Sequence, residues 1–397
     1  MLLIILAIVL GIIAGTITGL IPGIHINLVA LLLFFSSAFL LQYTTPLILV
    51  TFIISMAITH TFIDFIPSVF LGAPNEDTAL SILPGHRYLL KGKGYGAVKL
   101  TLIGSFFGLL IALAISPAFI VASPLFYPYL YKAIPFLLIF ISGFLILKEK
   151  QKIWALVIFM LSGILGFASL NFVLVKQPLF PLFTGLFGSS LLTVSFLQKV
   201  KVPKQKIKDI PIKKKEIKDA LGLSILSGSL VSFLPGVGSA TAAVISSGIK
   251  KLTEKSFLVL VGAINTIVMF LSFVALYSIN KPRTGIAVFV GKFLPALTMN
   301  QLWIFLIVGL IAGCIALFVA LFWARFFSKK VMKTDYKKLS LLILIFLVAI
   351  TPIISGWAGL FILLIGTAIG IATSIIGVKK IFMMGSLLIP VIIWNIV

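Results

Sequence analysis

Long apolar stretches follow one another along the whole chain, without the alternation of apolar and polar residues that is typical of strands. Residues 2–21 and 301–324 are each long enough to cross about 30 Å of hydrocarbon as a helix. The apolar segments expected to be helical are 2–21, 24–42, 45–72, 98–122, 133–147, 154–174, 180–197, 220–234, 237–249, 256–280, 301–324, 339–355, 357–377 and 381–396. The pattern predicts an all-α polytopic membrane protein and argues against a transmembrane β-barrel.

The composition agrees with a membrane location. Of the 397 residues, 61% are hydrophobic and 10% are charged, whereas about a quarter of the residues in ordinary soluble domains are charged. A formal net charge of +23 would suit a nucleic-acid-binding protein, but the Lys and Arg residues lie in short clusters between apolar segments. Such clusters are typical of cytoplasmic loops, so we expect the lipid bilayer as a partner and no nucleic acid.

One hydrophilic segment, residues 198–220, interrupts the apolar pattern near the middle of the chain. Its two prolines and many Lys residues predict a loop or a short surface helix. We therefore divide the chain into an N-terminal membrane repeat (1–197), a basic cytoplasmic linker (198–220) and a C-terminal membrane repeat (221–397).

The second half opens like the first. "GTITGLIPGIH" begins at Gly15 and "GSLVSFLPGVG" begins at Gly228, with a glycine, a hydroxyl residue and the Pro-Gly pair in register. Internal similarity of this kind indicates a duplication. Because proline and glycine interrupt helices, each half is expected to hold a re-entrant helical hairpin broken at Pro-Gly. Paired broken helices are typical of secondary transporters built from two inverted structural repeats.

The placement of charge predicts the orientation in a cell membrane. If 198–220 is cytoplasmic and each hairpin returns to the side from which it enters, nearly all Lys and Arg residues fall inside, as is usual for cytoplasmic loops. The exceptions are Lys132, Lys176, Lys281, Arg283 and Lys292. This arrangement places the N-terminus outside and requires the two halves to be inverted relative to each other.

The Pro-Gly breaks are the first candidate site. A break leaves a free helix N-terminus, whose N–H groups and partial positive charge suit an anionic group near the bilayer midplane. The alternative is a proline kink in a packed helix. The substrate-binding residues expected at the two breaks are Pro22, Gly23, His25, Asn27, Pro235, Gly236 and Ser239.

Asp64 is the one acidic residue within an apolar segment, and His60 lies four residues before it. Positions i and i+4 share a helix face, so the two side chains are expected to pair. Ionisable groups at membrane depth are costly and usually functional, and imidazole titrates near neutral pH. The pair is a candidate for proton or ion coupling. A structural ion pair and the catalytic pair of an intramembrane hydrolase are the alternatives.

A polar cluster follows the segment that contains Asp64. Pro74 and Asn75 end the apolar segment and are candidate substrate contacts. Glu76 and Asp77 come next, as candidate ligands of a coupling ion such as Na⁺ or as helix caps.

The second half offers a comparable pair, Asn265 and Thr266, in an apolar run. These residues hold a place similar to that of His60 and Thr61 in the first half, so they are candidate substrate contacts. A buried Asn that links helices is the alternative. The sequence contains neither the Cys/His spacing of a metal site nor a Walker lysine pattern, so we expect no metal and no cofactor.

Several of these segments resemble one membrane family. "GTITGLIPGIHINLVALLL" and "GSLVSFLPGVGSATAAVIS" are similar to the paired glycine and Pro-Gly segments of the large membrane subunit of tripartite tricarboxylate transporters. "APNEDTALSILPGHRYLLKGKGYGAVKL" resembles the stretch of that family with a Thr-Ala pair followed by two glycines seven residues apart. Here those residues are Thr78, Ala79, Gly85 and Gly92. The sequence of this stretch, "LPGHRYLLKGKGYGAVKL", is most similar to the shorter archaeal branch of the family.

The resemblance implies an inverted-repeat permease that takes up small carboxylates, driven by a gradient of Na⁺ or H⁺. It also implies a small membrane subunit and an extracytoplasmic binding protein as partners. A homodimer is a further expected assembly. The chain is therefore predicted to be a secondary transporter of an anionic metabolite and not an enzyme.

The main alternative is a translocase for polyprenyl-phosphate or another anionic lipid, because other families with paired Pro-Gly segments look similar. Those families typically carry Ser-Gly-Gly-Thr after Pro-Gly, which "PGIHIN" and "PGVGSA" do not match. A channel or a structural membrane component is a third alternative, against which the inverted repeats and the titratable groups argue.

Overall fold

The computed structural model describes residues 2–21, 26–72, 82–197, 203–232, 239–282, 284–331 and 336–396, and all the regular structure within them is helical. The elements are α1 (Leu2–Leu20), α2 (Ile26–Phe35), α3 (Ser37–Leu40), α4 (Pro46–Ile63), α5 (Phe65–Phe70), α6 (Ile82–Leu90), α7 (Gly94–Leu147), α8 (Lys152–Asn171), α9 (Leu179–Phe183), the π-helix η2 (Thr184–Ser189), α10 (Ser190–Leu197), α11 (Lys214–Ser232), α12 (Ser239–Ile249), α13 (Glu254–Ile279), α14 (Gly285–Phe293), α15 (Met299–Val331), α16 (Tyr336–Ser355), α17 (Ala358–Ile376), the 3-10 helix η3 (Lys380–Met384) and α18 (Gly385–Ile396).

Seven helical stretches in the described residues are long and apolar enough to cross a membrane. They are Leu2–Leu20, Pro46–Phe70, Gly94–Tyr129, Lys152–Asn171, Glu254–Ile279, Met299–Lys330 and Ala358–Ile376. The prediction of an all-helical, multi-pass membrane protein is confirmed. The Pro-Gly turns of the two predicted hairpins lie outside the described residues, so the hairpins and the inversion of the repeats stay predictions.

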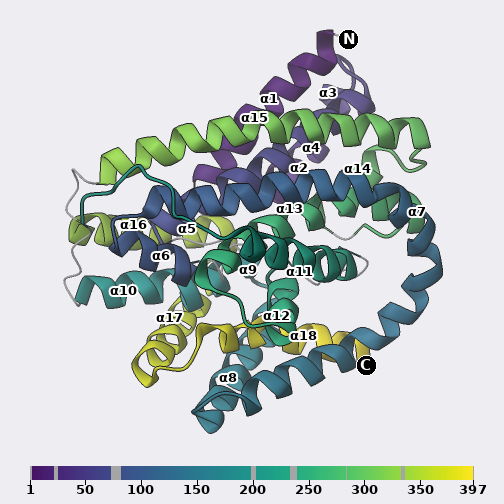
Figure 1. The fold of residues 1–397 in the computed structure, drawn as a ribbon. Helices are drawn as coiled ribbons and strands as arrows, with labels where there is room; N and C mark the ends of the chain where they lie inside the picture. Colours follow the sequence, from purple (N-terminus) through teal and green to yellow (C-terminus); the bar gives the residue numbers. More distant parts are fainter. Residues whose placement is uncertain are drawn as a thin grey trace.

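Several elements differ from the predicted segments. Segments 98–122 and 133–147 form one helix, α7, which curves round one end of the molecule (Figure 1). Four prolines lie inside α7, and helices bend at proline because it removes a hydrogen bond and crowds the preceding turn. α11 begins at Lys214, within the predicted linker. α6 and α14 were not predicted, because the nine residues of each are too few for a membrane span.

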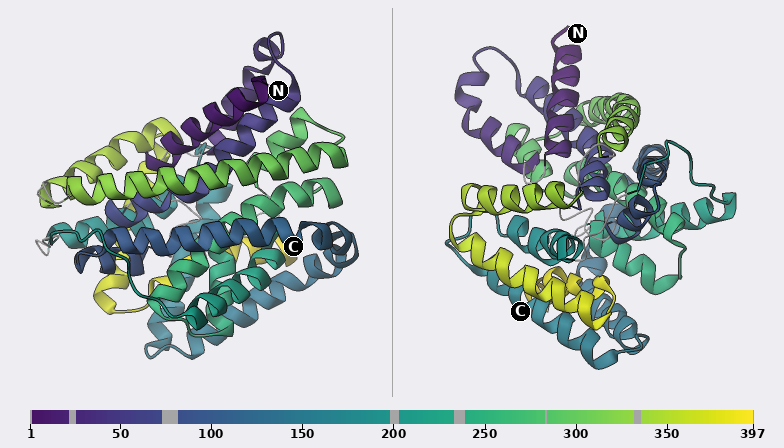
Figure 2. Two further views of the ribbon diagram at one scale, coloured as in Figure 1. Left: turned by 45° about the horizontal axis from the view of Figure 1, so that its top comes forward. Right: turned by 90° about the vertical axis from the view of Figure 1, so that its left-hand side faces the viewer.

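α13 forms the centre of the molecule, and nearly every residue from 256 to 276 is buried. α4, α7 and α11 pack against α13, and α1 packs against α4. α8, α17 and α18 pack together at the edge of the molecule opposite to α1 (Figure 2). The central position of α13 matters for the site, because side chains on it can reach both halves of the chain.

Glycines allow the closest helix contacts. Gly11, Gly15 and Gly19 share one face of α1, and a Cβ on Gly11 would lie 2.6 Å from the Phe52 carbonyl oxygen of α4. A methyl group at Gly104 of α7 would overlap the Val259 carbonyl oxygen of α13. Small residues at such spacings let helix backbones approach in membranes, where association depends on packing.

An extended segment of the linker, residues 203–213 (the strap), crosses the turn between α6 and α7. Gln205 is buried there; its Oε1 accepts a hydrogen bond from Gly94 N at 2.9 Å, and its Nε2 donates to the Leu89 carbonyl at 2.9 Å. Gly92 has φ +72°, and its carbonyl accepts from Lys206 N at 2.7 Å. The glycines of "KGKGYGA" therefore accommodate the strap.

Ion pairs join three basic runs, 86–99, the linker and 250–255, on one face of the molecule. The pairs are Arg87–Glu254 at 2.6 Å, Lys99–Asp209 at 2.6 Å and Lys250–Asp219 at 2.8 Å. The charge analysis places these runs on the same side of the membrane, and the contacts agree with it. An outward-facing N-terminus stays a prediction.

We expect Gln205→Leu to release the strap. The substitution leaves the Gly94 N–H and the Leu89 carbonyl without partners, at a cost of about 1–3 kcal/mol. Limited trypsin digestion should then cut after Lys204, Lys206 or Lys208 about tenfold faster than in the unmodified protein. Gln42→Leu, at an exposed turn, is the matched control and should leave the rate unchanged. Equal rates for both variants would show that Gln205 does not hold the strap.

Candidate functional site

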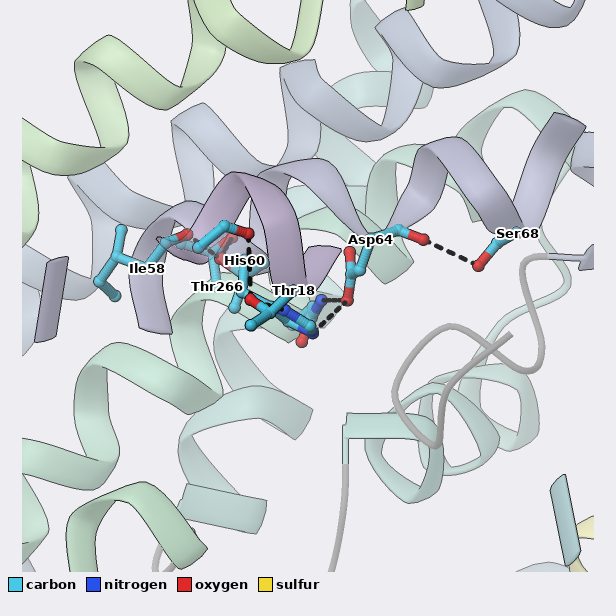
Figure 3. Close-up of polar contacts among 9 residues, drawn as sticks. Thr18, Ile58, His60, Asp64, Ser68 and Thr266 are labelled. Carbon is cyan, nitrogen blue, oxygen red and sulfur yellow. Dashed lines mark hydrogen bonds and ion pairs between the residues drawn. The ribbon is translucent and has the colours of Figure 1, made fainter. Parts of the chain in front are cut away.

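A helix break lies within the predicted ionisable pair. α4 ends at Ile63 and α5 begins at Phe65, so Asp64 occupies the junction. Pro67 has no N–H and cannot donate to the Ile63 carbonyl, which explains the position of the break. The Asp64 backbone remains helical (φ −62°, ψ −18°), and its carbonyl accepts a hydrogen bond from the Ser68 hydroxyl at 3.0 Å (Figure 3).

His60 and Asp64 face each other across one turn, as their spacing predicts. His60 Nε2 lies 4.0 Å from Asp64 Oδ2, and the two residues are 5% and 3% exposed. Burial of a carboxylate is costly unless partners compensate for the lost water, so the ionised form of Asp64 depends on its neighbours. The pairing is observed, whereas its role in ion coupling stays a prediction.

Asn265 of α13 supplies a second partner for the same carboxylate oxygen. Its Nδ2 donates a hydrogen bond to Asp64 Oδ2 at 3.1 Å, and Asn265 is 2% exposed. The two residues lie 201 positions apart in the chain and belong to different halves. Asp64 therefore connects the N-terminal half to the central helix of the C-terminal half.

The hydroxyls of Thr61 and Thr266 meet beside this contact, 3.4 Å apart. Thr61 Oγ1 also lies 2.8 Å from the Ile58 carbonyl oxygen, so when Thr61 donates to Ile58, the Thr266 hydroxyl is the donor between the two threonines. Both side chains are buried. The residues that hold comparable places in the two halves of the sequence thus lie side by side.

Thr18 of α1 contacts the other ring nitrogen of His60, with Thr18 Oγ1 3.1 Å from His60 Nδ1 (Figure 3). Thr18 has one hydroxyl proton, and the Gly15 carbonyl lies 3.2 Å from the same oxygen. When Thr18 donates to Gly15, His60 Nδ1 must carry a proton; when Thr18 donates to His60, the proton of a neutral ring is on Nε2, facing Asp64. The proton on His60 therefore has two positions that the surroundings accommodate.

Most of the other predicted site residues lie outside the part of the chain that the structure describes. Those outside the described residues are Pro22, Gly23, His25, Pro74, Asn75, Glu76, Asp77, Pro235 and Gly236. Asn27 lies in α2, but its side chain is not described, and Ser239 is the buried first residue of α12. Among the predicted residues, the structure brings together His60, Asp64, Asn265 and Thr266.

The sequence analysis missed two buried basic residues, His86 of α6 and Lys380 of η3, which are 3% and 7% exposed. Lys380 follows Lys379, and a Lys doublet beside an apolar segment usually indicates a cytoplasmic boundary. No signal in the sequence distinguishes the buried lysine from its exposed neighbour. Within the described ranges, no three His, Cys, Asp or Glu side chains form a group that could hold a metal ion.

A double-mutant cycle can measure the Asp64–Asn265 contact. We expect Asp64→Ala, Asn265→Ala and the double variant to give a coupling free energy of about 0.5–3 kcal/mol in unfolding, because the two side chains are in direct contact. Unfolding of the purified protein in detergent supplies the measurement. Asn395, which donates to the Val391 carbonyl of its own helix, is the control partner, and its coupling to Asp64 should be close to zero. Equal coupling for both Asn residues would contradict the contact.

Comparison with known proteins gives the site its context. The family model of the tripartite tricarboxylate transporter TctA family matches residues 5–385. An uncharacterized protein of Methanocaldococcus jannaschii is 34% identical over 272 residues, which is 67% of this chain and 66%, just under two thirds, of that protein. No solved structure matches the chain. Because the family model covers nearly the whole sequence, the chain belongs to the tripartite tricarboxylate transporter TctA family.

Proposed function

We propose that this protein is a secondary transporter that couples the uptake of a small carboxylate to an ion gradient, with Asp64 as the coupling group. The family match supports a transporter of the tricarboxylate type. The observation that carries the proposal is the buried Asp64 carboxylate, held by His60 of one half and Asn265 of the other. A charged group at this depth is costly, and such groups in membrane proteins line ion pathways.

The position of Asp64 relates ion binding to the conformation of the protein. In the ionised form, Asp64 Oδ2 accepts from Asn265 on α13 and faces His60 on α4. Protonation, or a bound Na⁺, changes this pattern at the contact between the halves. An ion that binds two conformations with different affinity shifts the population between them, which is the requirement for coupled transport. The carboxylate and the nearby Thr61 and Thr266 hydroxyls offer the oxygen ligands that Na⁺ prefers, so either ion fits.

The packing supports two structural repeats as part of the proposal, and their inversion rests on the placement of charge. α1 packs against α4 in the first half, and α11 packs against α13 in the second, in the same order along the chain. In a structure with two-fold pseudosymmetry, residues close to the axis contact their equivalents. Thr61 and Thr266 hold comparable sequence positions and lie in contact, as such an axis requires.

Membership of the family suggests which proteins act together with this chain. A small membrane subunit and an extracytoplasmic binding protein are the proposed partners, and a homodimer is a proposed assembly. The alternative of a lipid translocase gains no support from the family match.

Uptake into proteoliposomes tests the function. Radiolabelled citrate and succinate should accumulate under an imposed pH gradient or an imposed Na⁺ gradient, and an ionophore for that ion should abolish accumulation. Protein-free liposomes control for leakage. Asp209→Asn controls for mutagenesis, because Asp209 is an exposed carboxylate of the strap. Absence of uptake under both gradients would contradict coupled carboxylate transport by this chain alone.

A further inference from the structure

Lys380 is a buried amine in a protein whose other described Lys and Arg residues mostly lie at the surface. It begins η3, which packs against α8, α12 and α17. No described residue gives its Nζ a hydrogen bond or an ion pair. Lys379, the preceding residue, is exposed and forms an ion pair with Glu149. Two adjacent lysines therefore occupy opposite environments.

The described acidic residues are all engaged elsewhere. Asp64 is held by His60 and Asn265, and Glu149 by Lys379. The remaining described carboxylates, Asp209, Glu216, Asp219 and Glu254, contact Lys99, Thr253, Lys250 and Arg87, respectively. A buried ammonium without a counter-ion is unfavourable, so Lys380 is expected to receive an anion from outside the described part of the chain.

His86 is the second buried basic residue, and it belongs to the other half of the protein. Gly85 allows α6 to approach α5 closely, since a Cβ at Gly85 would lie 2.8 Å from the Val69 side chain. The His86 ring then donates a hydrogen bond to the Val69 carbonyl. Burial lowers the pKa of His86 to about 4; the Val69 hydrogen bond opposes this shift, and the positive charge of Lys380 adds to it. His86 is therefore neutral near pH 7, and Lys380 supplies the charge.

Through Val69, His86 lies close to the coupling cluster. Val69 is five residues beyond Asp64, which corresponds to roughly 7.5 Å along a helix. His86 and Lys380 come from different halves, as Asp64 and Asn265 do. Transporter substrates usually bind where repeats meet, near the coupling ion.

We propose that Lys380 binds a carboxylate group of the transported anion. The inference rests on the proposed function, because it assigns a binding residue for the same substrate class. Lys380 donates charge-assisted hydrogen bonds to the carboxylate, and the anion removes the cost of burying the ammonium without a counter-ion. The exposed, paired Lys379 does not bind substrate.

Ligand-dependent thermal stability of the purified protein tests this assignment. Citrate and succinate should raise the Tm of the unmodified protein and of Lys379→Met, the matched control. Lys380→Met keeps the apolar length of the side chain and removes the charge. We expect its ligand-free Tm to be equal to or above that of the unmodified protein, because an uncompensated charge is gone. We also expect the concentration of citrate at half-maximal stabilisation to rise about tenfold or more.

Two outcomes would overturn the inference. If the Lys380→Met variant retains the full citrate-dependent rise in Tm, Lys380 does not bind the anion. A ligand-free Tm several degrees below that of the unmodified protein would identify Lys380 as half of an internal ion pair.

The test also separates this inference from the proposed function. If the protein shows no gradient-driven uptake, yet Lys380 is required for stabilisation by citrate, the coupled function is wrong and the binding residue stands. If gradient-driven uptake is normal in Lys380→Met, the function stands and the inference is wrong.

Discussion

Asp64→Asn is expected to lower gradient-driven carboxylate uptake by about 100-fold, near the upper range of coupling free energies between two ligands. The substitution keeps the size of the side chain and leaves an amide oxygen that can accept from Asn265. It removes the one acidic group that the described membrane-spanning helices bury, so neither a proton nor Na⁺ can be bound as before. Initial rates of succinate uptake into proteoliposomes, under the gradient that drives the unmodified protein, measure the loss.

Folding must be checked in the same preparation, because a buried site tolerates changes poorly. The Tm of Asp64→Asn should lie close to that of the unmodified protein, and exchange of succinate across the membrane without an imposed gradient should persist. Asp209→Asn should match the unmodified protein in every assay. If Asp64→Asn still accumulates succinate against its gradient, Asp64 is a structural residue and another group couples the ion.

Gly104→Ala is expected to destabilise the protein by about 1–3 kcal/mol, the usual cost of overpacking a tight core. Gly104 lies where α7 crosses α13, and an added methyl group would overlap the Val259 carbonyl oxygen. Backbone atoms cannot rotate away as a side chain can, so the two helices must separate. The separation would also disturb the Ser105 hydroxyl, which donates to the Gly262 carbonyl at 3.2 Å.

Gly143→Ala is the matched control, because Gly143 lies in the same helix and nothing is within 4 Å of the position that its added methyl group would take. Replacing a glycine within a helix by alanine favours helix formation by up to about 1 kcal/mol, so this variant should be neutral or more stable. Thermal unfolding in detergent gives both values. Equal stability of the two variants would mean that α7 and α13 are farther apart at Gly104 than in the structure.

The apolar pattern predicted most of the helices, because a membrane-spanning helix must expose apolar side chains over its whole length. The pattern did not predict helices that are too short to span a membrane, that continue through prolines, or that begin with charged residues. α14 is short and lies beside Pro282, and α7 continues through four prolines because its neighbours support the bend. The start of α11 was placed too late, since its first turn is basic and charged residues were taken to mark the linker.

The candidate site was predictable in part. The spacing of His60 and Asp64 was sufficient to place them on one helix face, because residues i and i+4 of a helix lie on the same face. The sequence analysis did not predict Asn265 as the partner of Asp64, because no local pattern links residues 201 positions apart. Nine of the predicted site residues, including both Pro-Gly pairs, lie outside the described residues, so the hypothesis of anion binding at the breaks stays a prediction.

The sequence by itself determined that this chain is a helical, multi-pass membrane protein with one ionisable pair at membrane depth, because lipid imposes a local rule on every residue that faces it. Its motifs also indicated the transporter family. Only the tertiary structure decided which groups meet across the two halves and which of two adjacent lysines is buried. Helix packing brings together residues that are distant in the chain, and burial depends on neighbours that a local pattern does not specify.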